Sequence, residues 1–313
     1  MEYIRGMTFA PFAGRNTLLG EEPLLSMKIM KERLGTNTVI LVPGGVQQTP
    51  QSTVIDYTSE HTMSDKELKC MIHHAQEMGL RVFLKPTVNC LNGTWRAHIN
   101  FFDEDVPCEP KWFEWFSSYA DFQLHYATIA EENGCEMFIV GCEMVMAERR
   151  ETEWRKLIEE IRGEYHGLIS YNTDKYQENN VKWWDCVDVI SSSGYYPADD
   201  WENQLNRIEK VVDRYKKPFF FAESGCMSTT GSSERPNDWK LEGSINLQEQ
   251  KLWYEKAVHA MKKKSWVQGV AFWSWDARLY SPDEAENHKY YQIYEKPAEQ
   301  VIHWFFSDRS EKL

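Results

Sequence analysis

The stretch Lys217-Pro218-Phe219-Phe220-Phe221-Ala222-Glu223-Ser224-Gly225 decides how the rest of the chain is interpreted. Three consecutive aromatic residues between a proline and a Ser-Gly pair are typical of a short buried strand. If side chains alternate along it, Phe219, Phe221 and Glu223 face one side, and Glu223 ends an apolar column. Such a carboxylate caps the next turn, pairs with a basic neighbour or has a chemical role.

A second stretch of the same type occurs earlier in the chain. Glu136-Met137-Phe138-Ile139-Val140-Gly141-Cys142-Glu143 is also a short apolar run that ends in glutamate. Two buried strands that each end in a carboxylate suggest paired acid and base chemistry. We therefore interpret Glu143 and Glu223 as the candidate catalytic residues.

Strand and helix patterns alternate along the rest of the chain. The expected strands are Ile4–Ala10, Thr38–Val42, Leu80–Pro86, Met137–Cys142, Leu168–Asn172, Val187–Ser191, Phe219–Glu223 and Val267–Trp273. The expected helices are Glu22–Leu34, Ser64–Gly79, Lys111–Asn133, Thr152–Arg162, Trp201–Tyr215, Leu247–Lys263 and Pro297–Phe306. Eight strands that alternate with helices predict an α/β protein with a single (β/α)8 TIM barrel.

The length and the loop motifs agree with this fold. A chain of 313 residues with 42% hydrophobic content is long enough for one complete barrel. The alternative is a doubly wound open sheet, but no Gly-x-Gly-x-x-Gly motif follows any expected strand. We assign residues 1–313 to one catalytic domain.

The charge and the termini exclude several classes of partner. The net charge of −13 and the lack of any basic run beyond Lys262-Lys263-Lys264 argue against nucleic acids and anionic membranes. No apolar window approaches the length of a membrane span, and the first residues contain no apolar signal region. We expect a soluble, cytoplasmic monomer, with secretion left open.

The cysteine and histidine pattern predicts neither disulfides nor a metal site. The seven cysteines are scattered and never occur as Cys-x-x-Cys, which is typical of free thiols in a reducing compartment. His73 and His74 are adjacent on an expected helix and therefore point in different directions. We expect no metal and no cofactor.

The expected barrel gathers the strand-end residues at one face, where the active sites of such barrels are built. These residues are Phe9, Pro11, Lys85, Asn89, Glu143, Asn172, Asp174, Tyr195, Tyr196, Glu223, Trp273 and Trp275. The set combines two carboxylates with hydrogen-bonding and aromatic side chains. It suits glycoside cleavage, in which one carboxyl protonates the leaving oxygen while the other attacks the anomeric carbon.

The two carboxyl groups need opposite environments for these roles. Glu143 follows Cys142 and an apolar run, so it is the candidate for the raised pKa of a general acid. For Glu223 we expect the opposite, an ionised carboxylate held by a hydroxyl such as that of Tyr195 or Tyr196.

Tryptophan supports a sugar ligand. Indole faces pack on the carbon-hydrogen face of a pyranose, while polar groups bind its hydroxyls. The candidates on expected strand ends and long loops are Trp95, Trp239, Trp273 and Trp275. Tryptophans on the expected helices are interpreted as packing residues instead.

Several motifs of the chain are similar to those of glycoside hydrolase family 113, a group of β-mannanases within clan A of the retaining glycosidases. They are Arg5-Gly6-Met7-Thr8, Leu84-Lys85-Pro86, Trp95-Arg96, Gly141-Cys142-Glu143, Phe221-Ala222-Glu223-Ser224-Gly225 and Phe272-Trp273-Ser274-Trp275-Asp276. The resemblance covers essentially the whole chain. It implies that Glu143 is the acid/base and Glu223 the nucleophile. It also implies sugar binding by Asn92, Arg96, Asn172, Tyr195 and Trp273.

The resemblance has one departure. Many clan members carry asparagine directly before the acid/base, where its amide binds the sugar 2-hydroxyl, but this chain has Cys142. A thiol is a poor donor and acceptor, so that contact is either absent or made by another residue.

The resemblance implies a retaining endo-β-1,4-mannanase that acts on β-mannan or manno-oligosaccharides. The alternative is an exo-acting β-mannosidase or another clan A β-glycanase. The long loops Gly44–Met63 and Met227–Ser244 decide between endo and exo action if they close an end of the groove. A non-catalytic sugar-binding barrel is less compatible with two intact carboxylates.

Overall fold

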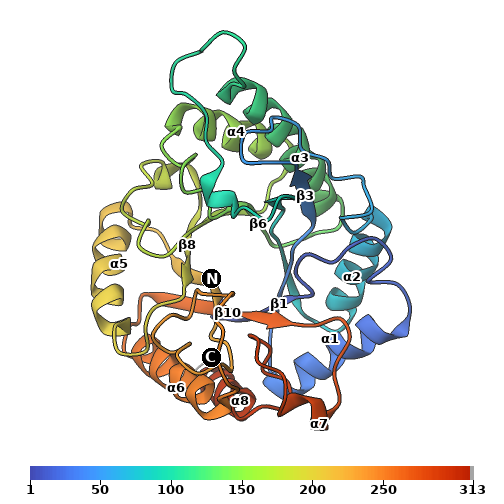
Figure 1. Ribbon diagram of the computed structural model, residues 1–313, viewed down its shortest axis with the longest axis vertical. Coiled ribbons are helices and arrows are strands. Elements are labelled where there is room, and N and C mark those ends of the chain that lie inside the picture. Colours follow the sequence, from blue (N-terminus) through green and yellow to red (C-terminus); the bar gives the residue numbers. More distant parts are fainter. Residues whose placement is uncertain (311–313) are drawn as a thin grey trace.

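Eight parallel strands form a closed barrel. In the computed structural model, which describes residues 1–310, the strands neighbour one another in the order β1-β10-β9-β8-β7-β6-β4-β2 (Figure 1). Their bounds are β1 Ile4–Phe9, β2 Thr38–Leu41, β4 Arg81–Leu84, β6 Met137–Cys142, β7 Leu168–Thr173, β8 Val189–Gly194, β9 Phe219–Ser224 and β10 Val267–Trp275. The expected (β/α)8 barrel is confirmed. Residues 311–313 of the expected domain lie outside the described residues.

Helices surround the barrel on its outside (Figure 1). They are α1 Glu21–Leu34, α2 Asp65–Glu77, α3 Trp112–Glu132, α4 Glu151–Glu164, α5 Trp201–Tyr215, α6 Leu247–Lys262, α7 Pro282–Ala285 and α8 Pro297–Ser310. The β7–β8 connection carries only the short 3₁₀ helix η2, Trp184–Cys186. Local signals explain the ends of α1 and α2: Ser64 and Glu67 form a capping box, and Gly35 ends α1 in the left-handed region.

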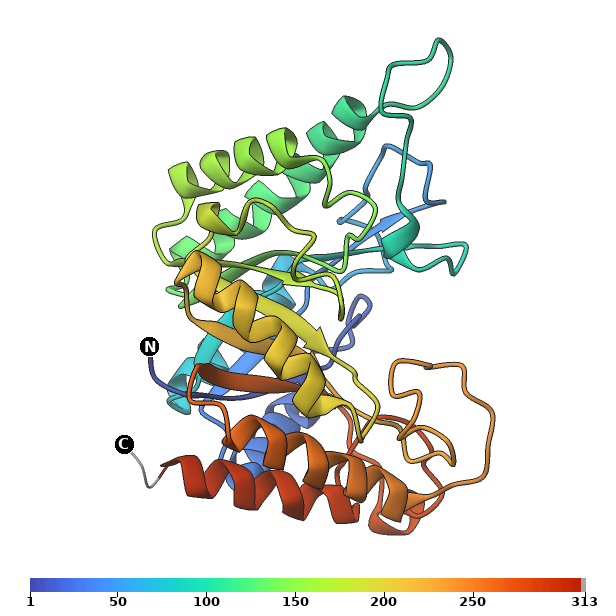
Figure 2. The same cartoon turned by 90° about the vertical axis from the view of Figure 1, so that its left-hand side faces the viewer.

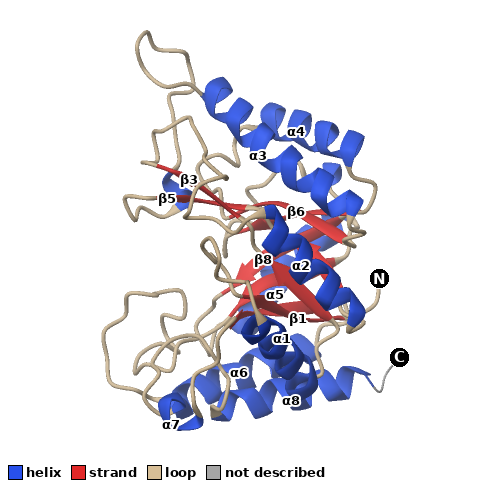
Figure 3. Ribbon diagram, turned by 90° about the vertical axis from the view of Figure 1, so that its right-hand side faces the viewer, coloured by secondary structure: helices blue, strands red, loops and turns tan. Residues whose placement is uncertain are grey.

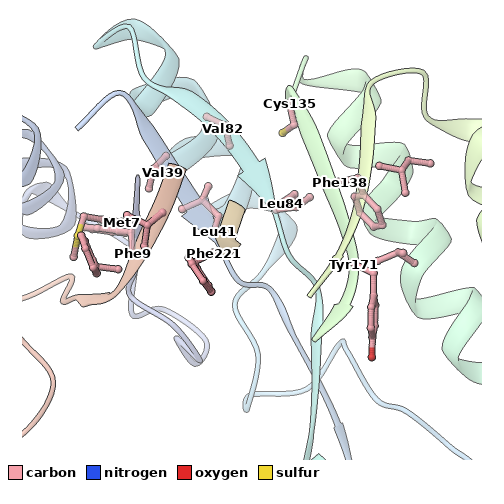
Figure 4. Packing of buried hydrophobic residues seen from close by; sticks show 14 of the residues in the cluster. Met7, Phe9, Val39, Leu41, Val82, Leu84, Cys135, Phe138, Tyr171 and Phe221 are labelled. Carbon is pink, nitrogen blue, oxygen red and sulfur yellow. The ribbon is translucent and has the colours of Figure 1, made fainter. Parts of the chain in front are cut away.

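Two apolar layers hold the barrel together. The first fills its interior with the buried side chains of Ile4, Ile40, Val42, Phe83, Met137, Ile139, Val189, Phe220, Ala222 and Ala271. The second lies between strands and helices, and Figure 4 shows part of it, including Val39, Leu41 and Phe138. Burial of such side chains is the main favourable term in folding. The interior layer also fills the barrel beneath its mouth.

A small second sheet extends the barrel on one side. The strands β3, Gly44–Gln47, and β5, Thr87–Cys90, follow β2 and β4 directly and pair in parallel, with Gly44 opposite Thr87. We expected residues Gly44–Met63 to form a loop, but the first four of them form the strand β3, so that part of the expectation is wrong. The extension leads into η1, Arg96–His98, which is thereby placed at the barrel mouth.

The long loops gather at one end of the barrel. Figures 2 and 3 show them on the side opposite the N-terminus. All barrel strands are parallel, so their carboxyl ends meet at this same end, as in other (β/α)8 barrels. Within residues 1–310, no helix has both the length and the apolar character needed to cross a membrane.

Candidate active site

The strand that carries Glu223 does not alternate as the sequence suggests. Phe219 and Phe221 belong to the layer between barrel and helices, so the expected column of Phe219, Phe221 and Glu223 is wrong. The register of β9 against β8 shifts near its end: Ser192 pairs with Phe221, but Ser193 pairs with Glu223. One extra residue on a strand reverses the facing of the residues after it. Glu223 therefore points into the barrel mouth.

A tight turn positions Glu143 after β6. The register against β7 shifts before Cys142, and Gly141 has φ 101°. A Cβ at Gly141 would lie 2.6 Å from the Tyr119 hydroxyl oxygen, so only glycine fits without movement. Glu143 itself has φ 53°, and its backbone N–H donates to the Asn172 carbonyl at 2.8 Å. The glutamate is therefore held in a backbone conformation that few residues adopt.

Three side chains donate hydrogen bonds to the Glu223 carboxylate. Lys85 and Cys142 donate to Oε1, the thiol at 3.2 Å, and the Tyr195 hydroxyl donates to Oε2 at 3.1 Å. Lys85 follows β4 and is fully buried, and Glu223 is only 4% exposed. A buried ammonium in contact with a buried carboxylate is an ion pair protected from screening by salt.

The charges around Glu223 keep it ionised. Burial is the largest single effect and acts to raise the pKa of Glu223. The positive charges of Lys85 and Arg96, together with the hydrogen bonds from Lys85 and Cys142, outweigh it and lower the pKa below its ordinary value. An ionised carboxylate at this position is suited to nucleophilic attack.

The Glu143 carboxyl is surrounded by hydrogen-bond donors. Ser193 Oγ donates to Oε1 at 2.7 Å, and Trp95 Nε1 donates to Oε2 at 3.0 Å. The Arg96 guanidinium lies 3.5 Å from Oε2. The expected apolar surroundings of Glu143 are therefore wrong. The residue is 7% exposed, and its carboxyl lies among polar groups at the barrel mouth.

Arg96 lies beside both carboxylates. Its Nε donates to the Cys142 carbonyl at 3.0 Å, and Nη1 donates to Asn89 Oδ1 at 2.9 Å. Its Nη2 lies 3.6 Å from the Cys142 sulfur, whose thiol faces Glu223. The residue before the acid/base candidate therefore contacts the nucleophile candidate.

Aromatic rings border the mouth on two sides. Trp273 is half-buried; its ring lies 5.5 Å from Phe12 and 5.7 Å from Lys85 Nζ. The Trp95 ring meets that of Trp239 edge-on at 6.1 Å, and Trp239 is 49% exposed. These rings offer flat apolar surfaces next to the polar carboxylates, as sugar sites require.

A family model that describes Glycoside Hydrolase Family 113 matches residues 7–296. The chain belongs to Glycoside Hydrolase Family 113. A search of curated proteins gave no match.

Solved structures of this family are highly similar to the chain. Two of them are a structure and a complex structure of a GH113 β-1,4-mannanase. Each is 52% identical to this chain, and the match has a TM-score of 0.97 and covers 98% of this chain and 99% of the other. The GH113 β-mannanase AaManA from Alicyclobacillus acidocaldarius, in complex with ManMIm, is 41% identical over 99% of this chain and 98% of its own, with a TM-score of 0.95. A β-D-glucuronidase of Dictyoglomus thermophilum, 16% identical with a TM-score of 0.66 over 99% of this chain and 51% of its own, shares the fold alone.

Two expected sugar-binding residues of the family 113 chain lie away from the carboxylates. The Tyr196 hydroxyl donates to Glu178 at 2.7 Å, and the ring is fully buried against Trp201. Trp275 is 1% exposed and donates to Ser26 Oγ at 3.0 Å. Placing these two residues in the mouth was wrong.

Asn172 and Asn92 are placed differently from the other expected residues. Asn172 is fully buried beneath the mouth, where its amide contacts other side chains of the site. Asn92 is exposed, and its Oδ1 accepts from Thr94 N–H at 3.1 Å, which stabilises the turn that leads to Trp95. Arg96, Tyr195 and Trp273 are brought together with the two glutamates.

Sequence reasoning missed two residues of the site. It placed Lys85 at a strand end without a role, and it did not single out Ser193. The signal for Ser193 was the run Ser191-Ser192-Ser193, because three hydroxyls in a row are unusual in a buried barrel strand.

Two further buried carboxylates, Glu148 and Asp174, interact with each other. Glu148 is buried and accepts from Tyr171 and Thr173 at 2.8 and 2.6 Å. Burial raises the pKa of Asp174 to about 7, and the charge of Glu143 adds to this. Across residues 1–310, no set of three or more His, Cys, Asp or Glu side chains is arranged to hold a metal ion.

Proposed function

We propose that this family 113 protein is a retaining endo-β-1,4-mannanase that hydrolyses β-1,4-mannosidic bonds in mannan and manno-oligosaccharides. The similarity to solved β-mannanases over almost the whole chain supports the substrate. The observation that carries the proposal is the pair Glu143 and Glu223, each buried at the end of its strand with its own set of donors.

In the proposed mechanism, the Glu223 carboxylate attacks the anomeric carbon while Glu143 protonates the leaving oxygen. The lowered pKa of Glu223, due to Lys85 and Arg96 in spite of burial, supports its role as nucleophile. Glu143 then accepts a proton from the water that hydrolyses the glycosyl-enzyme. Two inversions at one carbon retain its configuration.

The sugar-binding role is proposed for residues at the mouth. Trp95, Trp273 and Trp239 would pack on sugar faces. Arg96 and Tyr195, which lie next to the carboxylates, would bind polar groups of the sugar. Because the bond to be cleaved lies between Glu143 and Glu223, the sugar rings must occupy the space that these side chains border.

The test is product analysis with β-1,4-mannohexaose, next to cello- and xylo-hexaose. Internal cleavage of mannohexaose, abolished in Glu143→Ala and Glu223→Ala, is the expected result. Release of single mannose units only would favour an exo-acting β-mannosidase, and cleavage of another hexaose would favour a different clan A β-glycanase. Proton NMR of the first product tests the mechanism, because an inverting enzyme would release the α-anomer.

We also propose that residues 1–313 act as one domain and one monomer inside the cell. The seven cysteines are all free thiols, which suits a reducing compartment. Light scattering during size-exclusion chromatography tests the monomer, and fractionation of the producing cells tests the location. A dimer mass, or activity in the culture medium alone, would contradict these expectations.

A further inference from the structure

A buried chain of hydrogen bonds joins the two carboxylates. From Glu223 it runs to Lys85, then to Asn172 Oδ1 at 3.2 Å. Asn172 Nδ2 continues it to Ser193 Oγ at 3.0 Å, and Ser193 Oγ reaches Glu143 Oε1 at 2.7 Å. The three intermediate residues lie at the end of β4 and on β7 and β8, and each is fully buried.

The charge of Lys85 fixes the direction of this chain. An ammonium group only donates, so the Asn172 amide must present its oxygen to Lys85. Its NH₂ group then faces Ser193, and it also donates to the Thr173 carbonyl at 3.0 Å. Since Ser193 Oγ already accepts from Asn172, its own hydroxyl hydrogen is directed to Glu143. In each hydrogen bond of this chain between Lys85 and Glu143, the donor therefore lies on the side of Lys85.

The two oxygens of Glu143 face different donors. Oε1 receives the shortest hydrogen bond, from Ser193 at 2.7 Å, and is kept as an acceptor. Oε2 also faces donors only, the Trp95 indole at 3.0 Å and the Arg96 guanidinium at 3.5 Å. Together these contacts hold the Glu143 carboxyl in one orientation, with Oε1 toward Ser193 and Oε2 toward the aromatic rim.

We propose that Lys85 is a positioning residue that acts through Asn172 and Ser193 to hold the Glu143 carboxyl in the orientation from which it protonates the leaving oxygen. The inference rests on the proposed glycosidase function. In the step concerned, the O–H bond of the Glu143 carboxyl breaks and the proton passes to the glycosidic oxygen. The bond from the anomeric carbon to that oxygen breaks, its electron pair stays on the departing sugar, and a Glu223 carboxylate oxygen bonds to the carbon.

Without Lys85, the Asn172 oxygen loses its donor, and the bond from the amide NH₂ group to the Thr173 carbonyl remains to hold the amide. The bond from Asn172 to Ser193, and with it the bond from Ser193 to Glu143 Oε1, would then be held less firmly. Glu223 would also lose its nearest cation. The titratable or charged groups that interact with the two carboxylates include Lys85 after β4, Arg96 from η1, Cys142 from β6, Asp174 after β7, Tyr195 after β8 and Tyr291 before α8.

The experiment compares two mannobiosides in each variant. One has a sugar as leaving group, which needs protonation; the other has 2,4-dinitrophenolate, which departs without it. In Ser193→Ala, we expect kcat/KM to fall roughly ten- to a hundred-fold for the sugar substrate and to stay within about two-fold for the activated one. The matched control is Ser191→Ala, a buried serine two residues earlier on β8 whose hydroxyl donates to the Tyr171 carbonyl. It should leave the ratio between the two substrates unchanged.

Lys85→Met should affect both substrates, because it also removes the cation next to Glu223. We expect the acidic limb of the kcat/KM profile to move up by about one pH unit or more. An equal loss on both substrates in Ser193→Ala, or a wild-type ratio, would overturn the proposal. An unchanged acidic limb in Lys85→Met would do the same.

A further readout separates this inference from the proposed function. NMR of ¹³C-glutamate-labelled protein measures the titration of the Glu223 carboxyl without any substrate. If the unmutated protein cleaved no mannoside, the proposed function would fail. A higher Glu223 pKa in folded Lys85→Met, with no change in Ser191→Ala, would still show that Lys85 acts on Glu223, the first contact of the proposed chain. Equal Glu223 titration in Lys85→Met and wild type would contradict it.

Discussion

Replacement of Glu148 by glutamine should stabilise the protein increasingly as the pH rises. Glu148 is 3% exposed, and burial is the main reason that its pKa is raised from 4.5 to about 8. The hydrogen bonds from Thr173 and Tyr171 act against burial, whereas the charges of Asp174 and Glu178 act with it. The second oxygen, Oε2, has no hydrogen-bond partner among the described residues. Glutamine keeps the shape and is always neutral.

The direction of the effect is set by the two protonation states. The folded protein holds the Glu148 proton up to about pH 8, while the unfolded chain releases it near pH 4.5. The contribution of Glu148 to stability is therefore complete below pH 4.5 and is lost as the pH rises toward 8. Integration gives a cost of ~1 kcal/mol at pH 5 and ~4 kcal/mol at pH 8, since each unit of pKa shift is worth about 1.4 kcal/mol.

The assay is urea unfolding of wild type and Glu148→Gln at pH 5, 6.5 and 8. The free energy of unfolding of the variant, relative to wild type, should rise by ~3 kcal/mol between pH 5 and pH 8. For a chain of 313 residues this corresponds to roughly 5 °C in melting temperature. The pH dependence due to other titratable groups cancels in the difference between variant and wild type if the surroundings of those groups are unchanged.

The matched control is Glu159→Gln, an exposed glutamate on α4. Its difference from wild type should stay within about 0.5 kcal/mol at each pH. A difference between Glu148→Gln and wild type that is the same at pH 5 and pH 8 would refute the reasoning. It would mean that Glu148 titrates alike in the folded and unfolded chains.

Three further substitutions test other parts of the site. Trp239→Ala should raise the KM for manno-oligosaccharides roughly three- to ten-fold with little change in kcat. The control Trp304→Ala, at an exposed tryptophan on α8, should change neither KM nor kcat. A loss confined to kcat in Trp239→Ala would contradict the proposed sugar contact. Gly141→Ala should lower the free energy of unfolding by roughly 2–4 kcal/mol, because the new Cβ would clash with Tyr119 and the backbone has a positive φ. The control Gly163→Ala on α4, where the new Cβ has open space, should not destabilise the protein. Equal urea midpoints for Gly141→Ala and wild type would argue against a strained turn. Tyr195→Phe removes one donor from Glu223 and should lower kcat/KM about ten-fold in steady-state assays, and an unchanged value would show that Lys85 and Cys142 suffice.

The barrel and its strand-end glutamates could be predicted because they depend on local patterns. Apolar runs near Phe138 and Phe220 mark buried strands, and parallel strands bring their carboxyl ends together whatever the details of packing. The positions of Glu143 and Glu223 at the mouth are a consequence of this topology. Their roles remain proposals.

The facing of individual side chains could not be predicted from alternation alone. Trp273 and Trp275 should share a face, yet the register of β10 against β1 shifts between Met7 and Phe9, and Trp275 turns to the helices. Tyr196 points away from its neighbour Tyr195. Alternation is compatible with this, but it does not predict which of the two tyrosines faces the mouth. Such shifts depend on pairing with another strand and leave no local signal.

The hydrogen-bond partners of Glu143 and Glu223 could not be predicted from the sequence either. Lys85 and Glu223 are 138 residues apart, and their contact is set by the diameter and register of the whole barrel. The donors around Glu143 come from separate segments of the chain. No short motif records which polar side chains a closed barrel brings to one point.

The packed interior of the barrel also limits how water reaches the reaction. Ile40, Phe83, Phe220 and the other side chains of this layer are essentially fully buried, so the barrel has a solid floor beneath the mouth. The water that completes a catalytic cycle must therefore enter from the side by which the first product leaves. Any sugar hydroxyl still lodged there competes with water for the same reactive carbon. At high product concentration, part of the turnover should accordingly lengthen chains instead of shortening them.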